Sequence, residues 1–182
     1  MKKDFWANTT KQPNGRLIKK FIMLFAILLT AFLLDFGSKI IIHNKLIQMP
    51  GFELTLLNLP KAFPLKAGFS IAYNTGAAFG WFSGCSLLLL IVRIFLISVM
   101  ISYVFLRRSK NLFKLIPAIL ITGGAIGNVT DFFLYGHVID FIKLGFSKFY
   151  FPVFNLADFF ITVGFLWFVW GNAYHSEIAE GP

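Results

Sequence analysis

Four apolar stretches dominate the hydrophobic pattern of this chain, and each approaches the length needed to cross a lipid bilayer. About 20 apolar residues in a helix span ~30 Å of hydrocarbon. The pattern predicts transmembrane helices at about residues 21–42, 85–106, 112–134 and 152–174. Pro152 suits the first turn of the last helix, where a missing amide hydrogen does no harm.

The composition agrees with a membrane protein, because 57% of the residues are hydrophobic and only 14% are charged. The length suits one integral membrane domain over residues 1–182. The net charge of +9 does not indicate a nucleic-acid partner, because Lys and Arg collect in short segments beside the apolar stretches. The single cysteine, Cys85, excludes an internal disulfide and a thiolate metal cluster.

The basic residues predict the orientation. They are dense in the N-terminal segment and between the second and third apolar stretches, and sparse in the other two connections. The positive-inside rule therefore places both termini in the cytoplasm. The first stretch follows about twenty mostly polar residues and lacks a small-residue cleavage site, so we interpret it as a retained anchor.

The segment at about residues 43–84 is then extracytoplasmic, and Pro and Gly interrupt it too often for a span. Two short runs within it, Phe52–Leu56 and Phe69–Tyr73, predict strands of a small sheet on the outer surface. The fold class expected is an all-α membrane protein of four transmembrane helices with a small extracytoplasmic sheet.

Four of the eight acidic residues fall at a similar predicted depth, near the outer face of the membrane. They are Asp35, Asp131, Asp140 and Asp158. A carboxylate beside hydrocarbon costs several kcal/mol unless it is paired, protonated or facing water. Asp140 is expected in the outer loop before the last helix and Asp158 early within that helix, so we expect these two to meet.

Amides accompany two of the acids. Asn128 precedes Asp131 by three residues and Asn155 precedes Asp158 by three, so each pair is predicted to share a helix face. Small residues are also expected to matter: Gly123 and Gly127, four apart, favour close packing of the third helix against the fourth.

Two carboxylates held close together do not both ionise easily, and such a pair titrates as a unit. The charged member can deprotonate a water that attacks an amide carbonyl, while the protonated member donates to the carbonyl oxygen. Serine–histidine chemistry is poorly supported by only three histidines, one of them in the C-terminal tail. A zinc site is poorly supported as well, because His137 beside aspartates supplies only one of the His or Cys ligands that zinc sites use.

Several of these residues also have a simpler structural interpretation. Asp35 and Lys39 fit an ordinary helical ion pair, and Asn74-Thr75-Gly76 fits a turn. Arg93, inside the second span, fits a side chain that extends to the interface or pairs with an acid. A carboxylate at Asp158 also fits a structural hydrogen bond.

Five motifs occur in the order seen in signal peptidase II, and this resemblance covers about residues 21–174. The motifs are Asp35-x-x-x-Lys39, Asn74-Thr75-Gly76-Ala77-Ala78-Phe79, Gly123-Gly124-Ala125-Ile126-Gly127-Asn128-x-x-Asp131, Val138-Ile139-Asp140-Phe141 and Phe154-Asn155-Leu156-Ala157-Asp158. Each motif alone is weak, whereas five in sequence with four spans resemble that family specifically.

The resemblance implies an aspartyl protease of the bacterial cytoplasmic membrane that cleaves signal peptides from diacylglyceryl-modified prolipoproteins. It implies Asp140 and Asp158 as the catalytic pair near the outer face, and a fold of four helices with an outer β-cradle. No metal or organic cofactor is implied, and the expected partners are the prolipoprotein substrate and membrane lipids, with a monomeric enzyme. The substrate-binding or supporting residues that the motifs suggest are Asp35, Lys39, Asn74, Gly76, Asn128, Asp131 and Asn155.

One departure concerns the third motif, because the family commonly has arginine after the carboxylate where this chain has Phe132. Two other functions remain open from the residues alone. A proton- or cation-coupled transporter predicts carboxylates throughout the membrane depth. A non-enzymatic membrane subunit predicts that Asp140 and Asp158 are individually replaceable.

Overall fold

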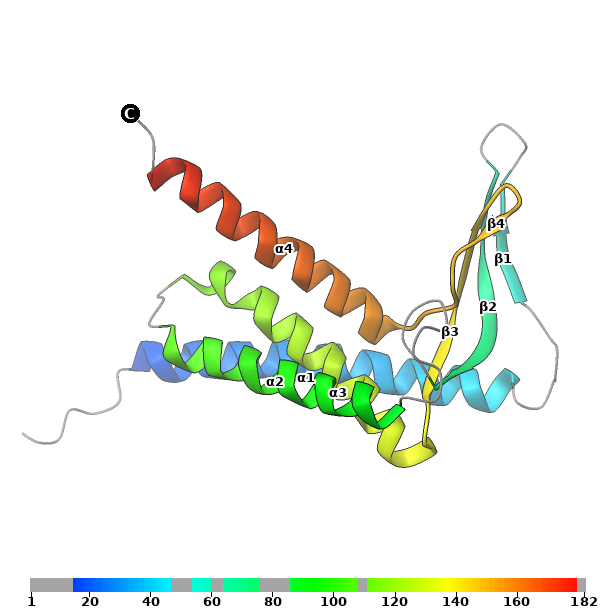
Figure 1. Ribbon diagram of the computed structural model, residues 1–182, viewed down its shortest axis with the longest axis horizontal. Coiled ribbons are helices and arrows are strands. Elements are labelled where there is room, and N and C mark those ends of the chain that lie inside the picture. Colours follow the sequence, from blue (N-terminus) through cyan, green and yellow to red (C-terminus); the bar gives the residue numbers. More distant parts are fainter. Residues whose placement is uncertain (1–14, 47–53, 60–63, 76–85, 108–110, 180–182) are drawn as a thin grey trace, which may run out of the picture.

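Four long helices and a four-stranded antiparallel sheet make up the described chain (Figure 1). The computed structural model describes residues 15–46, 54–59, 64–75, 86–107 and 111–179. In chain order the elements are α1 (Gly15–Leu46), β1 (Leu54–Asn58), β2 (Leu65–Asn74), α2 (Ser86–Leu106), η2 (Leu112–Lys114), α3 (Ile116–Tyr135), β3 (Val138–Phe146), β4 (Phe149–Tyr150) and α4 (Leu156–Ala179).

The helices run antiparallel in sequence order, so that α1 and α3 end, and α2 and α4 begin, at the end of the molecule that carries the sheet (Figure 1). Among the described residues, three helices are long and apolar enough to cross a membrane: those over Leu17–Lys45, Ser86–Leu106 and Ile116–Tyr135. The apolar part of the fourth helix, α4, is shorter and covers Leu156–Gly171. The mostly helical membrane fold is thus confirmed, while a fourth crossing stays a prediction.

The distribution of polarity is reversed relative to a water-soluble bundle. Large apolar side chains such as Phe25, Phe95 and Trp170 are exposed on the outside of the helices, whereas the acids and amides described below lie inside. Exposed apolar surface of this extent is typical of a protein whose solvent is lipid. The fold therefore hides its polar groups from hydrocarbon.

The central helix is α3, which packs against α1, α2 and α4. A Cβ atom added at Gly123 would come within 3.1 Å of both the Ala31 side chain and the Leu28 carbonyl oxygen of α1. One added at Gly124 would lie 2.5 Å from the carbonyl oxygen of Ala157 in α4. The predicted close packing of α3 against α4 is present, but Gly123 does not make it, because the helical rotation turns Gly123 toward α1 and its neighbour Gly124 toward α4.

The helix α3 ends at Gly136, whose φ of 76° is left-handed and whose N–H donates to the carbonyl oxygen of Phe132. Glycine adopts this conformation without steric cost, which is why helices often end in this way. The chain then turns directly into β3. This sharp exit brings the residues after α3 back against the ends of α1 and α4.

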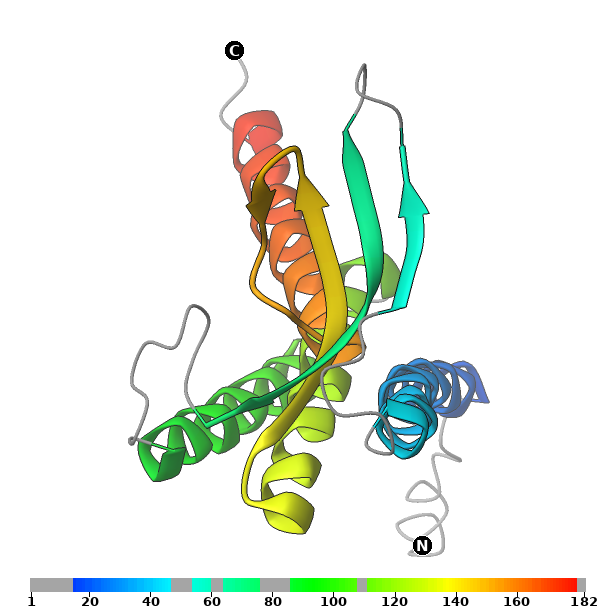
Figure 2. The ribbon, with the colours of Figure 1, turned by 90° about the vertical axis from the view of Figure 1, so that its right-hand side faces the viewer.

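The sheet has the order β1-β2-β3-β4 and projects from one end of the helices (Figure 2). Strands β1 and β2 overlap the two runs predicted from the sequence, whereas β3 and β4 were not predicted. Asp140 was expected in a loop, and this was wrong: it lies on β3, paired with Ala72 of β2. The reason is that β3 is a near-continuous apolar run without the alternation that marks a half-buried strand.

Candidate active site

The first turn of α4 holds Asp158 in a reciprocal cap. Asn155 precedes the helix, and its side-chain Oδ1 accepts the N–H of Asp158 at 2.9 Å. In return Oδ2 of Asp158 accepts the N–H of Asn155 at 3.3 Å. This is the geometry of a capping box. Because the helix starts at Leu156 and not near Pro152, the two residues do not share a helix face as predicted; Asn155 is the cap of the helix.

Asp140, on β3, accepts a hydrogen bond from the same residue, Asn155. The Nδ2 of Asn155 donates to Oδ1 of Asp140 at 2.7 Å, and the Nδ2 of Asn74 on β2 donates to its other oxygen at 2.9 Å. Asp140 is only 2% exposed. One amide side chain, that of Asn155, thus joins the two aspartates that the sequence singled out.

Asn128 on α3 completes this connection. Its Nδ2 donates to Oδ1 of Asp158 at 2.9 Å, while its Oδ1 accepts from Asn155 Nδ2 and from Lys39 Nζ, each at 3.1 Å. Three asparagines from three different elements therefore fix both carboxylates. Such amides hold a side-chain rotamer without adding a charge to the buried site.

Lys39 forms a buried charged centre next to these three asparagines. Its Nζ lies 2.7 Å from a carboxylate oxygen of Asp35 and 2.7 Å from one of Asp131, and the lysine side chain is 1% exposed. A buried ammonium is tolerated only when its donors are satisfied, and here three acceptors surround it. The interpretation of Asp35 and Lys39 as an isolated interfacial ion pair is replaced by a buried network across α1 and α3.

Both supporting carboxylates also hold backbone groups. Oδ1 of Asp35 accepts the N–H of Ala157 in the first turn of α4 at 2.8 Å, and Oδ2 of Asp131 accepts the N–H of Ile139 at 3.2 Å. Asp35 therefore stabilises the positive end of α4 from a separate helix. Each contact holds a residue that adjoins Asp158 or Asp140 in sequence, so the network fixes the backbone on which each of these two carboxylates sits.

A substitution at Gly127 tests how tightly this network is packed. A Cβ at this position would overlap Oδ2 of Asp35, so Gly127→Ala is expected to destabilise the protein by about 1–3 kcal/mol. Gly37→Ala on α1 is the control, because no atom lies within 4 Å of its added Cβ, and it should be neutral or stabilising. Thermal unfolding in detergent measures both variants. Equal stability of the two would show that Asp35 is free to move away.

Electrostatics distinguish Asp140. Burial, and next the nearby charge of Asp158, raise the pKa of Asp140 from 3.8 to about 7. The hydrogen bonds from Asn74 and Asn155 and the charge of Lys39 lower the pKa and oppose this effect. The raising effects are larger, so Asp140 holds a proton in mildly acidic solution.

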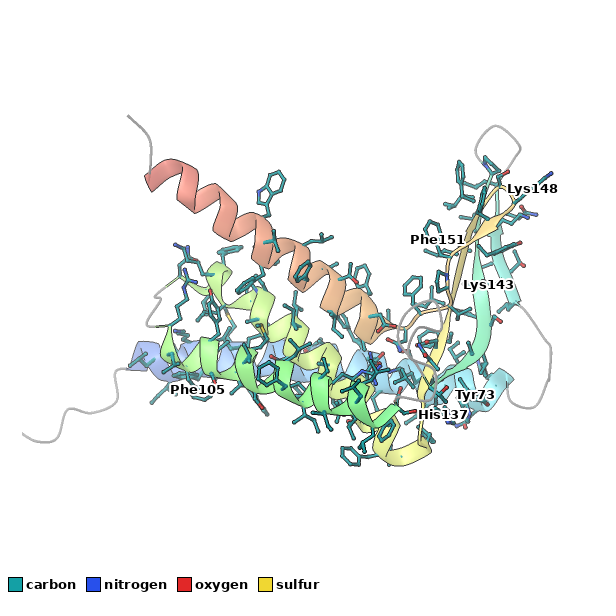
Figure 3. The ribbon with its side chains drawn as sticks, viewed as in Figure 1. Tyr73, Phe105, His137, Lys143, Lys148 and Phe151 are labelled. Carbon is teal, nitrogen blue, oxygen red and sulfur yellow. The ribbon has the colours of Figure 1, made fainter. Side chains whose placement is uncertain are left out.

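An open cleft of about 1080 Å³ adjoins both aspartates. One wall is the first turns of α4 with Asp158, and the opposite wall is the sheet with Asp140, Lys143 and Phe151, the last two labelled in Figure 3. Arg93 of α2 also lines the cleft and attracts Asp158, Asp140 and Asp131 electrostatically. Arg93 was interpreted as a side chain that extends to the interface or pairs with an acid, and its place in this cleft favours the second interpretation.

Two further predicted positions have separate outcomes. Gly76 lies outside the described residues. Phe132 is half-buried, and its ring packs against that of Phe133, with 6.4 Å between the ring centroids.

Oδ1 of Asp131 is buried without a hydrogen-bond partner among the described residues. Within the same described ranges, no group of three or more His, Cys, Asp or Glu side chains is arranged to hold a metal ion.

Comparison with known proteins agrees with this arrangement. The family model described as signal peptidase (SPase) II matches residues 27–173. The lipoprotein signal peptidase of Chlamydia felis is 45% identical over 123 residues, which cover 62% of this chain and 74% of that protein. That of Chlamydia pneumoniae is 36% identical over 154 residues, which cover 81% and 89%.

Two solved structures of bacterial membrane enzymes, determined by the in meso method, share the fold. The one at 2.3 Å resolution has a TM-score of 0.68 and 24% identity, covering 88% of this chain and 92% of the other. The one at 1.9 Å has a TM-score of 0.62 and 25% identity, covering 82% and 91%. The overall fold is thus one already seen in bacterial membrane enzymes.

Fold, cleft and comparisons together define a membrane protease. The chain belongs to the signal peptidase II family, since the family model matches most of its length. Membership decides between the three functions that the residues alone left open: the protein is an enzyme, and neither a transporter nor a non-enzymatic subunit.

Proposed function

We propose that this enzyme removes signal peptides from diacylglyceryl-modified prolipoproteins, with Asp140 and Asp158 as its catalytic pair. The observation that carries the proposal is that both carboxylates line one open cleft and are joined through two amides: Asn155 Nδ2 donates to Asp140 and to Asn128, and Asn128 Nδ2 donates to Asp158. The names of the relatives support lipoprotein substrates. Asp35 and Lys39 position the pair from outside the cleft, whereas Asn74 and Asn128 line the cleft and can also contact substrate.

The different environments of the two carboxylates assign their roles. Asp140, buried and with a pKa raised to about 7, is the acid; Asp158, half-buried at the helix start, is the base. The Asp158 carboxylate takes a proton from water, whose oxygen attacks the scissile carbonyl carbon, while Asp140 gives its proton to the carbonyl oxygen. The product of this step is a neutral gem-diol.

Collapse of the gem-diol reverses both proton transfers. Asp158 gives its proton to the leaving amide nitrogen, Asp140 takes a proton from one gem-diol hydroxyl, and the C–N bond breaks. The products are a carboxylic acid on the signal peptide and a free amine on the lipid-modified cysteine. The pair returns to its starting protonation state, so no further co-reactant is needed.

The membrane setting follows from the charge distribution. We place the enzyme in the bacterial cytoplasmic membrane as a monomer, with both termini in the cytoplasm. The starting end of α1, with Lys19 and Lys20, lies at the same end as Arg107 and Lys114, opposite the sheet. The positive-inside rule then puts the cleft near the outer face, where a lipid-anchored cysteine presents its preceding peptide bond.

A reconstituted assay tests the function. Purified protein in phosphatidylglycerol–phosphatidylethanolamine vesicles is given a prolipoprotein with or without the diacylglyceryl group, and mass spectrometry identifies the new N-terminus. We expect cleavage directly before the modified cysteine, and little cleavage of the unmodified chain. Equal cleavage of both substrates, or cleavage at another bond, would overturn the proposal.

The pH dependence follows from the raised pKa of Asp140. As pH rises through about 7 Asp140 loses its proton, so kcat/KM should fall on the alkaline side. Asn74 donates to Asp140 and favours the ionised form, so Asn74→Ala should move this decline to higher pH. Tyr73→Phe is the control, because the Tyr73 hydroxyl contacts His43 instead, and should leave the position of the decline unchanged.

Stability should follow the same ionisation. Because the pKa of folded Asp140 is above its ordinary value, the proton stabilises the folded state. This contribution is complete below pH about 3.8, the ordinary value, and is lost as pH rises through about 7. The difference in unfolding temperature between Asp140→Asn and wild type should therefore grow in favour of the variant as pH rises from about 3.8 to about 7, and level off above that. A difference that stays constant with pH would contradict the raised pKa.

A further inference from the structure

A second pocket lies at the end of the helices opposite the sheet. It has a volume of about 110 Å³ and is enclosed by the last turn of α2, the segment through η2 into α3, and the second half of α4. Pro117, in its wall, precedes Asp131 by fourteen residues, about 21 Å along α3 at 1.5 Å per residue. The pocket is therefore separate from the cleft and unused by the proposed reaction.

Among the described residues, two cations line this pocket. Arg107 follows α2, and its guanidinium carbon lies 5.1 Å from the ring centroid of Tyr103, whose hydroxyl accepts a hydrogen bond from it. Lys114 ends η2, is half-buried, and lines the same pocket. A cation required only for membrane orientation needs to extend into water. Here the guanidinium is held against the Tyr103 ring and lines the pocket, and it carries further N–H donors besides the one that bonds the Tyr103 hydroxyl.

Aromatic rings from three elements form the rest of the wall. Phe113 of η2 and Trp167 of α4 are 6.2 Å apart between centroids, and Tyr103 of α2 packs edge-on against Phe168 of α4 at 5.2 Å. Phe113 remains 67% exposed. Rings with a polar edge, such as Trp and Tyr, are typical of the level where lipid headgroups meet hydrocarbon.

Size and charge restrict the ligand. The pocket is smaller than the ~300 Å³ at which sites for drug-sized ligands begin. No carboxylate is found among the described residues that line it. A small anion attached to an apolar tail fits such a place, since basic pockets between helices on the cytoplasmic side bind anionic headgroups.

We infer that this pocket binds the phosphate group of an anionic phospholipid, and that Arg107 and Lys114 are the side chains that contact the phosphate. The guanidinium supplies hydrogen bonds in a fixed plane and the ammonium supplies a second charge. The acyl chains then lie along the exposed apolar faces of α2 and α4. Phosphate oxygens as a chemical class occur in free phosphate too, so the test separates the two sources.

The test measures lipid binding to the purified full chain in detergent. Native mass spectrometry titrates phosphatidylglycerol, phosphatidylcholine and inorganic phosphate separately. We expect phosphatidylglycerol to bind more tightly than phosphatidylcholine, and the double variant Arg107→Gln/Lys114→Gln to lose at least about tenfold in phosphatidylglycerol affinity. Lys19→Gln/Lys20→Gln removes the same charge at the same end but outside the pocket, and should change the affinity little.

A photoactivatable phosphatidylglycerol gives a second readout on the wild-type chain, which does not depend on any variant folding. Cross-links should fall on residues 103–107, 111–117 and 167–171. Cross-links elsewhere, equal affinity for both lipids, equal loss in the two double variants, or binding of inorganic phosphate as tight as that of the lipid would each overturn the inference. Because catalysis is not measured, these results are independent of the proposed function.

Discussion

Replacing Asp140 with asparagine, or Asp158 with asparagine, is expected to abolish signal-peptide release while leaving the fold intact. Each variant removes one of the two proton-transfer groups, and a single general acid or base contributes about 10²–10⁴-fold to a rate. The amide keeps the shape of the side chain and one acceptor oxygen, so each variant can still accept one of the two hydrogen bonds that its carboxylate accepts. Turnover in vesicles and the unfolding temperature are measured together.

The control for this pair of variants is Glu177→Gln, the same chemical change near the end of α4 far from the sheet. It should retain wild-type turnover. Asn155→Ala is a useful intermediate case, because it removes the connection between the carboxylates and keeps both of them; a partial loss of rate is expected. Full activity in either aspartate variant would end the proposal that they form the catalytic pair.

Replacing Lys39 with methionine is expected to be the most destabilising single change in the network. Methionine fills a similar volume but leaves Asp35 and Asp131 buried without their cation. Removing one member of a buried ion pair costs about 3–5 kcal/mol. Lys45→Met, an exposed lysine on the same helix, should change stability by about 0.5 kcal/mol or less. Denaturant or thermal unfolding in detergent measures the difference.

A triple variant separates lost charge balance from lost packing. Lys39→Met combined with Asp35→Asn and Asp131→Asn removes all three charges together, and should recover much of the stability lost in Lys39→Met. If the triple variant is no more stable than Lys39→Met, the cost lies in hydrogen bonding and packing and not in uncompensated charge. If Lys39→Met alone is as stable as wild type, the network does not support the site.

Much of the site was predictable from the sequence, because a carboxylate beside lipid is costly and each acid in an apolar stretch therefore indicates a polar site. Asp35, Asp131, Asp140 and Asp158 were expected at one depth, and the structure brings all four into one hydrogen-bonded network. Charge is so costly beside lipid that position along a span almost fixes position in space. The amides three residues before two of the acids pointed to the same place.

The details that could not be predicted depend on where elements start and how they rotate. Residues 152–155 are nearly as apolar as the helix that follows, so hydropathy did not show that α4 begins at Leu156 or that Asn155 caps it. The strand holding Asp140 becomes visible only through its pairing with β2. Lys39 contacts Asp131 and Asn128 across 92 and 89 residues of sequence, and no local pattern reports that.

Asp140 and Asp158 are proposed to act on one water molecule, and a structure with a bound peptide analogue tests this most directly. The analogue carries a hydroxyl-bearing tetrahedral carbon in place of the scissile carbonyl. We expect this hydroxyl to lie within about 2.6–3.2 Å of a carboxylate oxygen from each aspartate. A hydroxyl bound to one aspartate alone, or bound outside the cleft with the enzyme still inhibited, would contradict it.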